Sequence, residues 1–131
     1  TLEPAEHNRR SVYLYVKRSF PFPMFTTFDA PDTAASCGRR EETTVAPQAL
    51  TMMNSQFMVQ RASAMARRLE TVAGEEDRPR QIEAAFRLAF ARPPDAQEAA
   101  RALELMSQPG SDPLARLCLA LLNTNEFLYV D

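Results

Sequence analysis

The sequence has little of what metal, haem and histidine-dependent sites require. It contains one histidine, His7, and two cysteines, Cys37 and Cys118, in 131 residues. Cysteines so far apart form no zinc motif, and the Cys-x-x-Cys-His signature of haem attachment does not occur. A Ser-His or Cys-His catalytic pair would have to use His7, near the first residue. We therefore expect no cofactor and no metal site in this chain.

The sequence also lacks a large excess of charge of one sign, and it lacks long apolar runs. The formal net charge is -2, from 15 basic and 17 acidic residues, so no strong field attracts nucleic acid or an anionic membrane. No apolar stretch approaches the length of a membrane span, and the sequence has no signal peptide. Because the chain opens on Thr1 rather than Met, we expect a C-terminal piece of a larger protein, whose compartment the missing signal peptide leaves open.

Glycine is scarce and proline is plentiful, with three and ten residues respectively. The prolines lie in the first half of the chain and at the joints between helical patterns, which favours a rigid loop followed by helices with sharp boundaries. A hydrophobic content of 45% is typical of a globular fold. We predict one all-α domain over 1–131, with an extended arm and a long ordered loop over 1–44 and about five helices over 45–131.

The arm and loop are rich in aromatic side chains. Residues 11–18 combine β-branched and aromatic types, which favours an extended segment or short strand, with a helix as the alternative. Residues 19–44 hold four of the eight phenylalanines, three prolines and one glycine, a composition unlike a flexible linker. The rings could stack on sugars or bases, or they could form a small core beneath the loop.

Helical periodicity begins at Thr44, a candidate N-cap. Ser55, Asp77 and Ser111 are candidate caps of later helices, and Gly74 is a candidate stop. Glu83 and Arg87 are spaced as an ion pair on one helix face. The predicted inward-facing residues are Ala46, Ala49, Leu50 and Met53; Met58, Ala62, Met65 and Leu69; Ile82, Ala85, Phe86, Ala89 and Phe90; Ala99, Leu103 and Met106; and Leu114, Leu117, Cys118, Leu121 and Leu122.

The candidate polar site comprises Asp29, Asp32, Arg39, Arg40 and Gln48. The two carboxylates flank Ala-Pro and could hold a cation or transfer protons, or they could accept backbone N–H bonds and fix a turn. An arginine could fork onto either carboxylate and hold the loop in place. Gln48 could contact a ligand or bond to backbone. No residue is singled out as catalytic.

Five segments, taken in order, resemble the planctomycete PSD domain, the domain of unknown function fifteen-fifty-three. They are HNRRSVY at 7–13, FDAPD at 28–32, SCGRR at 36–40, TVAPQAL at 44–50 followed by Asn54, and NTNEFLYVD at 123–131. The match is to the C-terminal part of that domain. The resemblance implies a large secreted or periplasmic parent, often with a cytochrome c module upstream, and it implies no catalytic residue.

We therefore expect a non-catalytic interaction or structural module of a multidomain protein. Its expected partners are the upstream domains of the parent, including a cytochrome c module, and carbohydrate. The alternative is part of a hydrolase or redox enzyme that acts on polysaccharide and whose site is completed by upstream residues.

Overall fold

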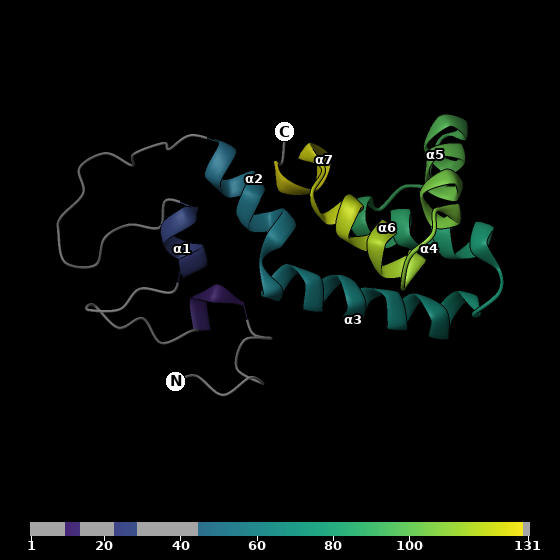
Figure 1. Cartoon of the computed structure of the whole chain (residues 1–131), viewed down its shortest axis with the longest axis horizontal. Helices are drawn as coiled ribbons and strands as arrows, with labels where there is room; N and C mark the ends of the chain where they lie inside the picture. The colour runs from purple at the N-terminus through teal and green to yellow at the C-terminus, as the bar shows by residue number, and fades with distance from the viewer. Residues whose placement is uncertain (1–9, 14–22, 29–44, 130–131) are drawn as a thin grey trace, which may run out of the picture. The chain divides into compact units, whose positions relative to one another are not determined.

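The computed structural model describes residues 10–13, 23–28 and 45–129 (Figure 1). The chain divides into two units, Thr1–Gln48 and Ala49–Asp131. The boundary lies close to the expected division between the loop and the helical half.

The first unit contains two short helical elements, η2 (Ser11–Tyr13) and α1 (Pro23–Thr27). In η2 the backbone N–H of Tyr13 donates to the carbonyl of Arg10 at 2.9 Å. The strand predicted for this stretch is therefore wrong over Ser11–Tyr13, because the N–H group is satisfied within a single 3-10 turn rather than by a neighbouring strand. Part of the predicted loop is also helical, namely α1. This helix starts at Pro23, and proline suits the first position of a helix.

The second unit is built from helices, which confirms the all-α prediction. They are α2 (Val45–Asn54), whose first residues belong to the first unit, α3 (Gln56–Ala73), α4 (Arg78–Phe90), α5 (Ala96–Ser107), α6 (Pro113–Leu122) and α7 (Asn125–Leu128). Helix α6 lies alongside α3, and α4 packs against both (Figure 1). No residue that the structure describes belongs to a strand.

Side-chain caps start these helices where the sequence has Ser or Asp. Ser55 accepts from the N–H of Met58 at 3.3 Å, and Asp77 accepts from the N–H of Arg80 at 3.1 Å, as predicted. For α6 the predicted cap is wrong. Asp112, not Ser111, accepts the N–H of Ala115, at 2.8 Å, because its carboxylate immediately precedes Pro113 and reaches the first turn.

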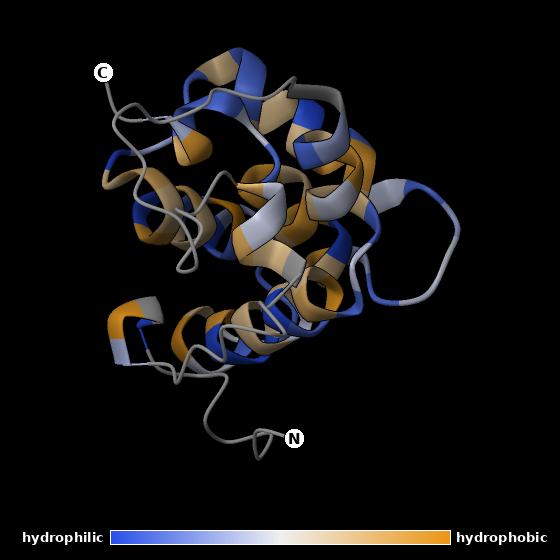
Figure 2. Cartoon of the chain, turned by 90° about the vertical axis from the view of Figure 1, so that its left-hand side faces the viewer, coloured by the Kyte–Doolittle hydropathy of each residue, from blue (hydrophilic) through white to orange (hydrophobic). Residues whose placement is uncertain are grey.

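The core forms where the apolar faces of α3, α4, α5 and α6 meet, and Figure 2 shows apolar segments gathered where the helices face one another. Its buried apolar residues are Met52, Met58, Ala62, Ala66, Leu69, Ile82, Ala85, Phe86, Ala102, Met106, Leu114, Leu117, Cys118, Leu121 and Leu122. The inward face predicted for α6 is fully confirmed, and that of α4 is confirmed at Ile82, Ala85 and Phe86.

Two inward predictions fail. Leu103 on α5 is 39% exposed, whereas Ala102, which is not among the predicted residues, is buried together with the predicted Met106. On α2 the predicted Ala49 is exposed, Leu50 and Met53 are 61% and 57% exposed, and Met52 is the buried residue. The buried face of α2 is therefore turned from the predicted one, and the buried face of α5 is turned from Leu103 toward Ala102.

One buried polar side chain fixes the turn between α3 and α4. The amide of Gln81 donates to the carbonyls of Gly74 and Glu75, with the second contact at 3.0 Å. Gly74 ends α3 with a φ of 86°, a conformation that glycine adopts without strain. The end of α3 and the start of α4 are thereby held together.

Candidate functional site

The candidate polar site lies almost entirely outside the described residues. That is so for Asp29, Asp32, Arg39 and Arg40. Gln48 lies on α2 and is half-buried. The grouping of these five side chains therefore stays a prediction, and the functional geometry that the structure does show lies in the second unit.

The densest polar cluster there surrounds Arg92, in the loop between α4 and α5. Its guanidinium donates to Glu98 at 2.7 and 2.8 Å, and to Glu126 at 2.7 Å through two further N–H groups. A fifth bond, at 3.2 Å, goes to the carbonyl of Pro93. The same guanidinium lies over the rings of Phe86 and Phe90, 5.8 and 5.5 Å from their centroids. These contacts join α4, α5 and α7.

Glu98 has a second role in this cluster. It forms a capping box with Asp95, since Asp95 accepts the N–H of Glu98 at 2.8 Å and Glu98 accepts the N–H of Asp95 at 2.7 Å. Hydrogen bonds from Arg92, then from the Asp95 backbone, lower the pKa of Glu98 to about 2. Hydrogen bonding to Arg92 likewise lowers the pKa of Glu126. All three groups are charged at neutral pH, as a structural clamp requires.

A second feature is an open pocket of about 360 Å³ between α3 and the ends of α4, α6 and α7. Its lining is mostly apolar. The residues are Arg61, Ala64, Met65 and Arg68 from α3, Leu88 and Ala89 from α4, Leu122 from α6, and Phe127 from α7. Leu88 and Phe127 are 43% and 40% exposed, so apolar surface faces solvent at this place.

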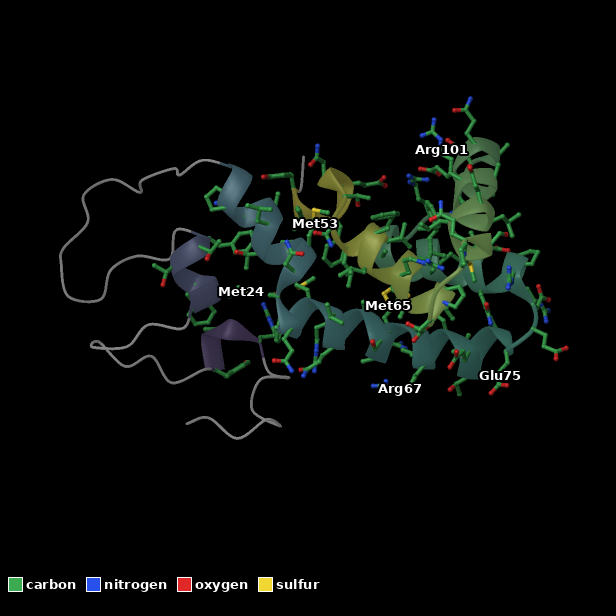
Figure 3. The ribbon with its side chains drawn as sticks, viewed as in Figure 1. Met24, Met53, Met65, Arg67, Glu75 and Arg101 are labelled. Carbon is green, nitrogen blue, oxygen red and sulfur yellow. The ribbon has the colours of Figure 1, made fainter. Side chains whose placement is uncertain are left out.

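The pocket has a positively charged side. Both charged residues in its lining are arginines, Arg61 and Arg68, and both come from α3. The guanidinium of Arg61 lies over the ring of Phe57, 5.4 Å from its centroid. Met65 points from α3 toward α6, whereas Arg67 lies on the opposite side of the helix (Figure 3). The side of α3 that lines the pocket is therefore distinct from the side that carries Arg67.

The cluster of Arg92, Glu98 and Glu126, called the clamp from here on, and the pocket meet at α7. Glu126 is held by Arg92, and the next residue, Phe127, lines the pocket. Because α7 comprises only Asn125–Leu128, a bidentate ion pair at one of its residues restrains the whole element. Arg92 thus positions one wall of the pocket from outside it.

The thiol of Cys118 is buried inside the second unit. Cys118 has a free, fully buried thiol, and burial raises its pKa to about 12, so it is a small core residue as predicted and not a thiolate nucleophile. Over residues 10–13, 23–28 and 45–129 there is no group of three His, Cys, Asp or Glu side chains placed to hold a metal ion. Among these same residues no helix has the length and apolarity of a membrane span.

Sequence reasoning missed both features for different reasons. The capping box has a readable signal, Asp95-x-x-Glu98, but Glu126 is distant in the sequence and nothing local pairs it with Arg92. The pocket combines residues predicted as core, such as Met65 and Ala89, with Arg61 and Arg68, which lie outside the predicted core face of α3. Only the packing of four helices brings these residues to one place.

One family comparison gave a match. The model of a family described as PSD1, protein of unknown function (DUF1553), matches residues 2–106 of the chain. The segment at 123–131, which also carries the resemblance in the sequence, lies beyond the matched part. No curated protein and no solved structure shows significant similarity to the chain.

Proposed function

The chain belongs to the PSD1 family of proteins of unknown function, and we propose that it is a non-catalytic docking module of a larger secreted or periplasmic protein. The compartment and the larger parent follow from the family resemblance of the sequence. The docking role follows from the surface of the second unit. Its partners would be other domains of the parent, with a cytochrome c module as one candidate.

The observation that carries the docking role is the pocket at α3, α4 and α7. An open apolar surface with a few polar groups at its edge is typical of binding sites, since exposed apolar area is costly unless a partner covers it. Leu88 and Phe127 supply that apolar area, and Arg61 and Arg68 supply the polar edge.

The main polar side chains of the unit support a scaffold role. Arg92 bonds to two carboxylates, Gln81 bonds to the turn after α3, and Asn123 donates to the carbonyl of Leu119 at 2.7 Å. Their hydrogen bonds are directed to the protein itself, so they hold the helices that shape the pocket.

The test is a titration of the isotope-labelled chain followed by amide NMR shifts, with anilinonaphthalene sulfonate as an apolar anionic probe. We expect shifts confined to the pocket, at Ala64, Leu88 and Phe127. Leu88→Glu should abolish them, because it places a negative charge on the apolar wall and repels the anionic probe. The matched control is Val72→Glu, on the more exposed side of α3 and outside the pocket lining.

Two results would contradict the proposal. One is shifts scattered over the unit that persist in Leu88→Glu, which would mean unspecific binding. The other is a specific response to a cello-oligosaccharide at a different surface, which would favour the alternative of a polysaccharide-processing component.

A further inference from the structure

We propose that the occupant of the pocket is an acidic amphipathic helix of a partner protein. This inference rests on the docking function proposed above and names the chemistry of the partner. Three properties of the pocket lead to it: the spacing of its arginines, the size of the side chains between them, and the sign of its charge.

The pocket residues of α3 are spaced so that a second helix lying along α3 can match them. Arg61, Ala64, Met65 and Arg68 lie at positions i, i+3, i+4 and i+7 of α3 and all line the pocket. At 1.5 Å of rise per residue the two arginines stand about 10.5 Å apart along the axis. A second helix that lies along α3 presents side chains at the same interval when they are seven residues apart.

The side chains between the arginines permit close approach of such a helix. Ala64 on α3 and Ala89 on α4 are small, so they leave a recess between larger neighbours. Met65 is an unbranched, adaptable side chain, which suits a surface that takes apolar groups of a partner. Leu88 and Phe127 form the facing wall. The recess fits apolar residues placed between the two acidic positions of the incoming helix.

The charge fixes the sign of the partner. The pocket lining holds two arginines and no acidic residue. Arg68 is exposed and makes no ion pair with any residue in the described part of the chain. A carboxylate at the matching position of a partner would pair with the Arg68 guanidinium at the rim, where such contacts set orientation and association rate.

The experiment uses two stapled, fluorescein-labelled peptides of about two heptads, since unstapled helices of this length are marginal in water. One has Glu seven positions apart with Leu at the two positions between that face the same side. The other has Lys in place of each Glu. Fluorescence anisotropy with the full chain measures both affinities. We expect the Glu peptide to bind at least about tenfold more tightly than the Lys peptide, with a difference that shrinks as salt is added.

A charge reversal and its neighbour make the matched pair of variants. Arg68→Glu should weaken binding of the Glu peptide by about fivefold or more, because it replaces an attraction at the rim with a repulsion. Arg67→Glu makes the same charge change about 100° around α3 from Arg68, outside the pocket lining, and should leave the affinity within about twofold. Both residues are exposed, so neither change should unfold the helix.

The outcomes separate this inference from the docking function. Equal affinity for both peptides, with NMR shifts still confined to the pocket, would overturn the acidic partner and leave docking intact. Equal effects of Arg67→Glu and Arg68→Glu would also overturn it. A self-associated chain whose pocket the Glu peptide cannot enter would show that a second copy is the occupant. No shift at the pocket with either peptide or with the sulfonate probe would overturn both proposals.

Discussion

Replacing Phe86 with alanine tests whether the core lies where the structure places it. Phe86 is 5% exposed, and its ring meets that of Phe90 edge-on with centroids 5.5 Å apart. Truncating a buried phenylalanine costs about 3–5 kcal/mol. The lost aromatic pair places Phe86→Ala near the middle of that range, at about 4 kcal/mol. Since domains of this size have roughly 5–15 kcal/mol of stability, the variant should remain folded in water but unfold at a much lower guanidinium concentration.

The matched control is Leu103→Ala, because the sequence pattern predicts both residues to be core. Leu103 is 39% exposed, so water can fill the space and the loss should be about 1 kcal/mol. Guanidinium denaturation followed by circular dichroism gives both values. Phe86→Leu, with an expected loss of about 1–2 kcal/mol, keeps the comparison measurable if the alanine variant is too unstable. Equal losses at Phe86 and Leu103, or a loss below about 1 kcal/mol at Phe86, would refute the reasoning.

Three further predictions concern single polar or reactive groups. The native pKa of Glu98, about 2, lies below its ordinary value of 4.5, so its contribution to stability is present above pH 4.5 and is lost as pH falls toward 2. Thermal melts across this range should show that loss, and Glu98→Gln should flatten it. In a Cys37→Ser background the Cys118 thiol should react with a disulfide reagent only after unfolding, because it is fully buried. If Cys118 of the folded protein reacted as fast as an exposed thiol does, this prediction would be contradicted. Gln81→Leu should cost about 1–3 kcal/mol in denaturant, because two turn carbonyls lose their donor, and an unchanged midpoint would argue against the observed bonds.

The parts of the fold that the sequence predicts are those with one continuous apolar stripe. Helix α6 repeats leucine at helical spacing, so only one face can be buried, and all its predicted core residues are buried. Helix α5 is different, because small Ala102 and flexible Met106 turn inward while Leu103 stays partly exposed. Hydrophobicity alone ranks leucine above alanine, whereas close packing of helices favours the smaller residue.

The functional geometry is less accessible from the sequence than the fold. The Asp95 capping box can be read from local spacing, but the second carboxylate on Arg92 comes from α7. Arg61 and Arg68 look like ordinary solvated charges until α4 and α7 place Leu88 and Phe127 opposite them. Long-range packing creates both features, and neither leaves a periodic signal in the chain.

The most direct test of the docking account is a charge exchange across the proposed contact. Arg68→Glu is combined with a stapled peptide whose facing Glu is replaced by Lys, and the four pairings of protein and peptide form a double-mutant cycle. The account predicts that the exchanged pair binds more tightly than either mismatched pair, by about fivefold, because the ion pair is restored with its signs reversed. If the effects of the two changes simply add, Arg68 does not contact the peptide at that position and the acidic helix does not lie along α3.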